Sequence, residues 1–217
     1  VLFNAAAYTY KVKDLQVVNF VNATSSIRNA AEASISGFEM DLTWRTPVQG
    51  LTLNGAMAYN RSKYDSFPGA PCYNGQTVAE GCVLGTQELG GQVVPRSPEW
   101  NLQAGFNYET PVGANYKLGL TGGLNHSSSY LTDASNSPGS RQKAYTMLDG
   151  TIRFGAEDDS WQVSVIGRNL TNQFIFFAAP DAPFTGNNAF GVRLGDRFGS
   201  VSRGREILLQ VGFKFGQ

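Results

Sequence analysis

The 217-residue sequence has no excess of charge and no long apolar run, and each absence excludes a class of protein. Its 17 basic and 17 acidic residues give a formal net charge of zero. We therefore expect no nucleic-acid partner, because phosphate binding needs a concentrated basic surface. No stretch of about 18 consecutive apolar residues occurs, which excludes a transmembrane helix. A membrane-spanning β-strand needs only about 9–11 residues, half of them polar, so a membrane β-barrel is still possible.

Histidine and cysteine are also scarce. His126 is the only histidine, and it is far in the sequence from the two cysteines, Cys72 and Cys82. The cysteines lie close together in a segment rich in glycine and proline. We expect a disulfide between them rather than a two-cysteine metal site, and a disulfide would indicate an oxidising compartment. No other cluster suggests a metal.

The sequence shows no nucleophile–base pair, so we expect no catalytic residues, no cofactor and no enzyme activity. Glu39 and Asp41 would share one face of a strand about 7 Å apart, which is compatible with a catalytic carboxylate pair. We interpret them instead as two charges that face a polar interior near Arg45.

The strongest pattern in the sequence is the alternation of apolar and polar residues. In the segment 206–215 one face of an extended strand carries only apolar residues, namely Ile207, Leu209, Val211, Phe213 and Phe215. Apart from Leu208, the other face carries polar residues and glycine. Similar alternation upstream predicts eight strands in all, at about 2–18, 31–45, 51–60, 100–109, 116–125, 143–154, 161–172 and 206–215.

The predicted connections alternate between short and long. Tight turns are expected at 47–50, 111–115 and 156–160, and longer connections at 22–29, 65–95, 133–142 and 173–202. This asymmetry is typical of outer-membrane β-barrels, which have short periplasmic turns and long external loops, whereas β-sandwiches lack it. The predicted fold class is therefore all-β, an antiparallel transmembrane β-barrel or a fragment of one.

The alternation also predicts which side chains face lipid and which face the lumen. We expect one set to face lipid, represented by Leu53, Leu120, Val163 and Leu209. We expect their neighbours to face the lumen, represented by Asn54, Thr121, Ser164 and Gln210. Aromatic residues beside the tight turns predict a girdle at one membrane interface, formed by Trp44, Tyr108, Tyr116, Phe154, Trp161 and Phe215.

Three segments resemble the TonB-dependent outer-membrane receptors. Ser36-Gly37-Phe38-Glu39-Met40-Asp41-Leu42 resembles a "GxExxL" strand of that family. The segment 161–172, which ends in Asn-Leu-Thr-Asn, resembles the penultimate strand, and 205–215 resembles the last strand. The resemblance implies a location in the bacterial outer membrane, contact with outer-membrane lipid, and TonB-energised uptake of a scarce ligand such as a ferric siderophore.

The resemblance implies that residues 1–217 are the C-terminal part of such a barrel. These receptors have about 22 strands and an N-terminal plug domain, which would supply the contact with TonB; the plug and the first fourteen strands have no counterpart here. Val1-Leu2-Phe3-Asn4 has neither an initiator methionine nor a basic signal-peptide start, so we expect a piece of a longer product. Gly216 and Gln217 depart from the family, which usually ends on the aromatic residue.

An alternative is a complete eight-stranded barrel that acts as a small passive channel or a structural protein. The two interpretations differ at the first and last strands. In a section of a larger barrel, residues 5–10 do not pair with residues 209–215, and we expect this open edge. In a complete barrel the two segments exchange backbone hydrogen bonds along their length.

Ligand-binding candidates come from the last long loop and the lumen. Arginines and phenylalanines in that loop could hold an anionic, aromatic-bearing ligand through ion pairs and cation–π contacts, and Arg168 would face the lumen. The alternative is a packed external loop with surface arginines. The candidates are Arg168, Phe176, Phe177, Phe190, Arg193 and Arg197.

Overall fold

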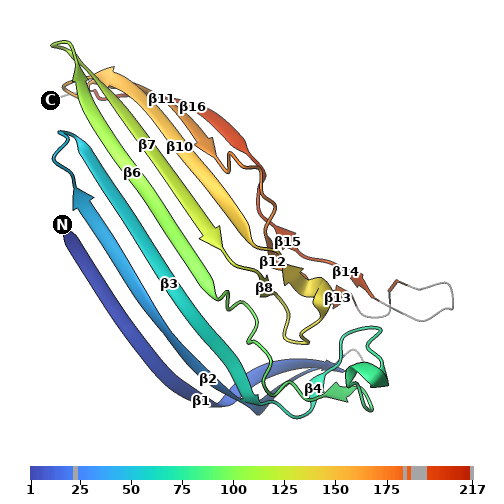
Figure 1. The fold of residues 1–217 in the computed structure, drawn as a ribbon. Helices are drawn as coiled ribbons and strands as arrows, with labels where there is room; N and C mark the ends of the chain where they lie inside the picture. The colour runs from blue at the N-terminus through green and yellow to red at the C-terminus, as the bar shows by residue number, and fades with distance from the viewer. Residues whose placement is uncertain (22–23, 183–184, 187–194, 216–217) are drawn as a thin grey trace.

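The computed structural model describes residues 1–21, 24–182, 185–186 and 195–215. Its main feature is one antiparallel sheet of eight long strands, each paired with the next long strand along the chain (Figure 1). These strands are β1 (Leu2–Val21), β2 (Thr24–Arg45), β3 (Leu51–Ser66), β6 (Trp100–Val112), β7 (Tyr116–Ser127), β10 (Tyr145–Ala156), β11 (Trp161–Arg168) and β16 (Glu206–Phe213). The predicted all-β fold with eight antiparallel strands is confirmed.

Short turns join the strands at one end of the sheet, and long loops join them at the other (Figure 1). The start of β1 and the end of β16 both lie at the short-turn end (Figure 1). In their described residues, the long loops contain short elements: β4 (Ala70–Pro71), η1 (Val78–Glu80), β5 (Thr86–Gln87), β8 (Tyr130–Leu131), η2 (Pro138–Ser140), β9 (Arg141–Gln142), β12 (Phe176–Ala178), β13 (Asp181–Ala182), β14 (Asp196–Arg197) and β15 (Ser200–Val201). Across the described ranges, no helix has the length and apolarity that crossing a membrane requires.

The sheet is open. In the part of the chain that the structure describes, β1 pairs only with β2 and β16 pairs only with β11. The two strands lie on opposite edges of the curved sheet in Figure 1. The predicted open edge between residues 5–10 and 209–215 is therefore confirmed, and the pairing that a complete eight-stranded barrel requires is not found.

The first hairpin is longer than the sequence predicts. Residues 24–29, expected in a polar connection, belong to β2 and continue the pairing with β1, from Gln16 opposite Asn29 to Val21 opposite Thr24. That expectation was wrong because polar composition excludes a strand only where one face must be apolar. A register shift between Val12 and Leu15 interrupts the ladder, and Asp14 there has a φ of 54°.

The two faces of the sheet differ as the alternation predicts. Strand pairing places Leu53, Phe106, Gly122, Gly150, Gly167 and Ile207 in one continuous row across six strands. The same face exposes large apolar side chains, including Ile152 and Leu209, which are 57% and 71% exposed. The opposite face carries polar contacts: the Arg153 guanidinium pairs with Glu109, and Thr121 donates to Asn107 at 3.1 Å.

Aromatic side chains form two clusters on the apolar face. At the short-turn end, Phe154 lies 5.4 Å from Tyr116 and 6.0 Å from Trp161 between ring centroids, as the predicted girdle requires. The second cluster, which the sequence analysis missed, lies toward the loop end, where Tyr59 is 5.6 Å from Phe38 and 4.8 Å from Trp100. In β6, Trp100 precedes Tyr108, a residue predicted in the girdle, by eight positions. For a strand tilted by about 45°, this separation is roughly 20 Å along the barrel axis. An apolar band therefore lies between the two clusters.

A small apolar core at the loop end anchors the first long loop. It contains Ala31 and Ala33 of β2, Tyr64 of β3, and Phe67, Ala70 and Leu89 of the loop itself. Phe67 is 1% exposed, and its ring centroid lies 5.1 Å from that of Tyr64. The loop therefore docks on the projecting ends of the strands, which fixes its position relative to the sheet.

Candidate ligand-binding loops

Three long loops meet at one end of the sheet: 67–99, 128–144 and 169–205. Hydrogen bonds join each loop to both of the others. The Asn74 backbone N–H donates to Asp181 Oδ2 at 2.9 Å, and Gln87 Nε2 donates to the Ser135 carbonyl at 2.8 Å. The Phe176 backbone N–H donates to Gln142 Oε1 at 2.7 Å. The loops therefore form one connected surface.

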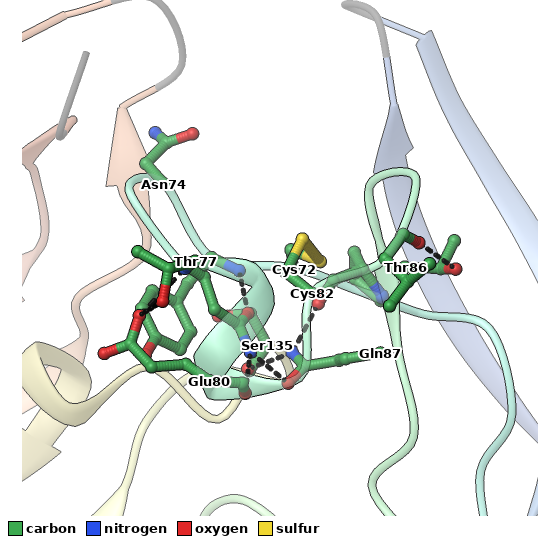
Figure 2. Close-up of a disulfide and its surroundings, with 12 residues drawn as sticks. Cys72, Asn74, Thr77, Glu80, Cys82, Thr86, Gln87 and Ser135 are labelled. Carbon is green, nitrogen blue, oxygen red and sulfur yellow. Dashed lines mark hydrogen bonds between the residues drawn. A yellow bond between two sulfur atoms is a disulfide. The ribbon is translucent and has the colours of Figure 1, made fainter. Parts of the chain in front are cut away.

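The first loop is closed by the disulfide between Cys72 and Cys82, the pair expected from the sequence (Figure 2). Between the cysteines, the Glu80 carboxylate accepts hydrogen bonds from the Thr77 backbone N–H at 2.8 Å and from its hydroxyl at 2.9 Å. These bonds, the one from the backbone first, lower the pKa of Glu80 below its ordinary value. The disulfide and the hydrogen bonds of Glu80 therefore fix the conformation of the segment between Cys72 and Cys82, which forms one side of the loop surface.

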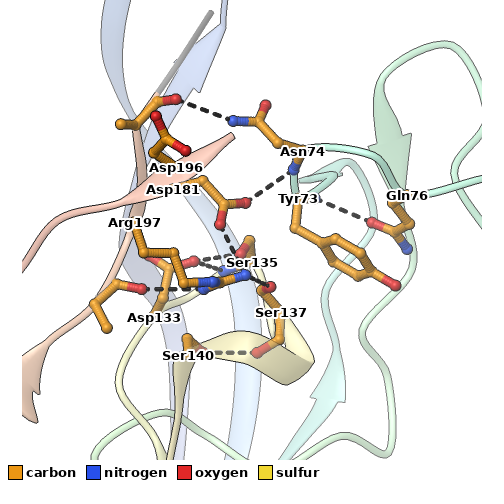
Figure 3. Close-up of polar contacts among 12 residues, drawn as sticks. Tyr73, Asn74, Gln76, Asp133, Ser135, Ser137, Ser140, Asp181, Asp196 and Arg197 are labelled. Carbon is orange, nitrogen blue, oxygen red and sulfur yellow. Dashed lines mark hydrogen bonds and ion pairs between the residues drawn. The ribbon is translucent and has the colours of Figure 1, made fainter. Parts of the chain in front are cut away.

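An ion pair between Arg197 and Asp181 lies where the loops meet (Figure 3). Arg197 Nη2 lies 2.8 Å from Asp181 Oδ1, an ion-pair contact without hydrogen-bond alignment at that oxygen. The same guanidinium donates to Ser137 Oγ at 2.5 Å and to the Ala179 carbonyl at 3.2 Å. Gly139 lies against the guanidinium so closely that a Cβ atom there would collide with it. Arg197 therefore ties the second loop to the third.

A small cavity lies beside the guanidinium, and we call it the arginine-side cavity. It has a volume of about 160 Å³, and its walls include Arg141, Phe176, Arg197 and Phe198. Two residues expected from the sequence, Phe176 and Arg197, are thus brought together. Arg141 joins them from the second loop through packing between loops, a contact that no local sequence pattern indicates, and Phe198 follows Arg197 directly in the third loop.

A second cavity lies beside the carboxylate, and we call it the aspartate-side cavity. Its volume is about 330 Å³, and the first, second and third loops all line it, through residues that include Cys72, Tyr73, Asp133, Asp181 and Phe198. Phe198 lines both cavities, while Arg197 lines only the first and Asp181 only the second. Sequence reasoning missed this cavity; the nearby disulfide was the only local signal.

The remaining candidates lie elsewhere. Phe177 is 57% exposed on β12, next to Phe176, and is not among the residues that line the arginine-side cavity. Arg168 ends β11 and lines a separate open hollow of about 620 Å³ on the polar face, together with Asp149, Arg203 and Glu206. Phe190 and Arg193 lie outside the described residues.

Glu39 and Asp41, the two carboxylates compatible with a catalytic pair, lie on the polar face of the sheet. Glu39 and Asp41 line a shallow hollow of about 330 Å³, and Asp41 accepts a hydrogen bond from Asn4 Nδ2 at 2.9 Å. Within the described ranges, no ion pair joins either carboxylate to Arg45. His126 contacts Thr146 Oγ1 through Nδ1 at 2.8 Å.

The Asn-Leu-Thr-Asn segment has a structural role at the start of the third loop. Asn169 has a φ of 48°, and its backbone N–H donates to Asp149 Oδ1 at 2.7 Å. Its side-chain amide donates to the carbonyls of Gln173 and Arg203 at 2.7 and 3.0 Å. Asparagine tolerates this left-handed conformation and supplies both hydrogen bonds. The segment therefore turns the chain out of β11. Through Asn169 it also joins the start of the third loop, at Gln173, to its end, at Arg203.

Comparison with solved structures identifies this arrangement of strands and loops. The ferric yersiniabactin uptake receptor FyuA from Yersinia pestis matches 99% of the chain with a TM-score of 0.70 at 19% identity. The siderophore receptor PiuA from Acinetobacter baumannii matches 98% with a TM-score of 0.64 at 18% identity. BauA, the ferric preacinetobactin receptor from Acinetobacter baumannii, matches 96% with a TM-score of 0.58 at 18% identity. The chain spans 27%, 26% and 26% of these three receptors, so the likeness concerns the fold of one part of the barrel.

Sequence comparison gives the family. No curated protein sequence matches the chain significantly. Residues 1–170, which run from β1 to the corner after β11, match the family described as TonB dependent receptor-like, beta-barrel. The match covers more than three quarters of the 217 residues, and the open antiparallel sheet fits it. The chain therefore belongs to the β-barrel family of the TonB-dependent receptors.

Proposed function

We propose that this chain is the C-terminal part of an outer-membrane receptor that takes up a ferric siderophore with energy supplied through TonB. The observation that carries the proposal is the connected loop surface at one end of an open barrel sheet, where two small cavities flank the Arg197–Asp181 ion pair. Such a surface suits capture of a small ligand from outside the cell. The names of the structural neighbours, which include a siderophore receptor and a ferric yersiniabactin uptake receptor, support iron-bearing cargo.

In this proposal each part of the chain has its own task. The apolar face of the sheet contacts outer-membrane lipid, and the polar face meets the lumen and the plug domain of the whole receptor. The plug supplies the contact with TonB, which these residues do not make themselves. The arginine-side cavity, with Phe176 and Arg197, and the lumen residue Arg168 are the proposed contacts for anionic and aromatic parts of the ligand.

Uptake of radioactive iron by whole cells tests the proposal. Cells that carry the full-length receptor are grown under iron limitation and offered a panel of ⁵⁵Fe-loaded siderophores, with receptor-deletion and TonB-deletion strains as controls. We expect uptake from at least one siderophore, and both deletions should abolish it. Equal uptake in all three strains for every siderophore would contradict the proposal. Uptake that needs the receptor but not TonB would favour a passive channel.

A further inference from the structure

We propose that the aspartate-side cavity binds a positively charged group attached to an aromatic ring, such as an arylalkylamine. The inference rests on the proposed receptor function and names the chemical class that one part of the loop surface selects. It differs from the expectation of an anionic ligand, which the arginines of the third loop suggest. The charge of the residues around this cavity has the opposite sign.

The described residues of the cavity wall carry a net negative charge. Asp133 and Asp181 both line the cavity, and Arg197 neutralises Asp181 from outside it. No cationic side chain is among the described residues of the wall, so the Asp133 carboxylate sets the sign of the charge there. A carboxylate or phosphate entering this cavity would be repelled, whereas an ammonium group would be attracted.

One oxygen of the Asp133 carboxylate is available to accept a hydrogen bond from a ligand. Asp133 Oδ2 accepts from the Ser135 backbone N–H at 3.0 Å and from the Ser135 hydroxyl. These bonds orient the carboxylate through one oxygen. No described residue donates a hydrogen bond to Oδ1, so that oxygen can accept one from a ligand ammonium group. A charge-assisted bond of this kind is among the stronger contacts in a binding site.

The apolar walls define the rest of the ligand. Phe198 is 61% exposed although it lines both cavities, and Tyr73 lies on the wall contributed by the first loop. Pro71, Pro180 and the disulfide-bonded Cys72 add flat or apolar surface. Aromatic faces attract both rings and cations, so an amine next to a ring would satisfy the walls and Asp133 together. A volume of about 330 Å³ is enough for one ring with a short amine-bearing chain.

Binding of a matched pair of small probes tests this inference. Phenethylamine and phenylacetate have nearly the same shape and opposite charges. Ligand-observed NMR titrations would measure the affinity of each for the full-length receptor in lipid nanodiscs. We expect phenethylamine to bind to the wild type, and Asp133→Asn to weaken this binding at least tenfold. We expect Asp133→Asn to leave phenylacetate affinity unchanged or to raise it.

A matched aspartate at the opposite end of the sheet provides the control. Asp158 accepts from the N–H of Ser160 at 3.0 Å, the same two-residue spacing and distance as Asp133 and Ser135. Asp158→Asn should leave phenethylamine affinity unchanged. Asparagine can accept the same backbone hydrogen bond, so both variants keep their turns. As a second variant, Phe198→Leu changes an exposed ring and should also weaken phenethylamine binding.

The inference is overturned if wild-type receptor does not bind phenethylamine, if it binds phenylacetate as tightly, or if Asp133→Asn leaves phenethylamine affinity unchanged. It is also overturned if Asp158→Asn weakens binding as much as Asp133→Asn. These outcomes are separate from the iron-uptake test. If phenethylamine binding depends on Asp133 but the receptor shows no TonB-dependent uptake, the proposed function is contradicted. The inference about the ligand of the cavity is then still supported.

Discussion

The backbone N–H of Asn74 donates to Asp181 Oδ2 at 2.9 Å across 107 positions of the chain. Asp181 also pairs with Arg197, which in turn reaches Ser137 in the second loop. The three loops are thus tied together around a carboxylate whose side chain is only 10% exposed. Loops joined in this way should open together rather than one at a time.

The first prediction tests that connection in the full-length receptor. Arg197→Gln removes the charge that neutralises a largely buried carboxylate, and we expect it to lower the free energy of loop opening by about 1–3 kcal/mol. Amide hydrogen exchange should speed up around Asn74, Ser137 and Asp181 together. Arg203→Gln is the control, because Arg203 is 88% exposed in its pair with Glu206 and such pairs contribute at most about 1 kcal/mol. Faster exchange confined to the third loop would contradict the connection.

The second prediction concerns the disulfide. Purified receptor should contain Cys72 and Cys82 as a bonded pair, two hydrogens lighter than the reduced form by mass spectrometry. Replacing both cysteines by serine should destabilise the folded loop by roughly 2–3 kcal/mol, because the sequence separation of 10 residues sets a modest loop-closure entropy. Limited proteolysis should then cut between residues 72 and 82. Two free thiols in protein taken from an oxidising compartment would refute the expectation.

The third prediction is a pH dependence in the same loop. The hydrogen bonds from Thr77 lower the pKa of Glu80 in the folded loop. Their contribution to stability is therefore complete above the ordinary pKa of a glutamate and is lost as the pH falls from there through the lower folded pKa. Hydrogen exchange at the Thr77 amide should accelerate relative to its intrinsic rate in this range. The Glu80→Gln variant should lack this transition, and an identical transition in both would argue against the assignment.

The fourth prediction compares two neighbouring residues of β10 on opposite faces. Ile152→Arg places a charge on the apolar face, and in a membrane-embedded barrel we expect it to cost about 2–4 kcal/mol. Thr151→Arg places the same charge on the polar face and should cost far less. Urea unfolding of the full-length receptor in lipid vesicles measures both values. Similar costs for the two variants would mean that the apolar face does not contact lipid.

The sequence predicts the sheet well because its determinants are local. Alternation along 206–215 and 51–60 needs only neighbouring residues, and the tight turns carry glycine, proline or acidic residues at the reversals. The projecting part of the first hairpin was missed, because its polar residues have no apolar face to reveal the strand. The second aromatic cluster was also missed, since Phe38, Tyr59 and Trp100 meet only once the strand register is known.

The loop site was harder to predict because its contacts are distant in sequence. Arg197 and Phe176 were identified from composition, but the partner of Arg197 was not. Asp181 faces it across the short β13–β14 ladder of the same loop, and Ser137 reaches it from the second loop, 60 positions away. The sign of charge in each cavity depends on that pairing. Composition alone therefore suggested an anion site, whereas the geometry divides the surface into an arginine side and an aspartate side.

The most direct test of the central claim, that this sheet is a lipid-facing section of an outer-membrane barrel, is the accessibility of spin labels on adjacent residues. Single cysteines at Leu120, Thr121, Thr151 and Ile152 of the full-length receptor in lipid vesicles would be labelled, with the native cysteines protected by their disulfide. We expect oxygen dissolved in lipid to relax the labels at 120 and 152, and an aqueous nickel complex not to reach them. Labels at 121 and 151 should show much less oxygen contact. Strong relaxation by the nickel complex at 120 and 152, equal to that at 121 and 151, would contradict the account.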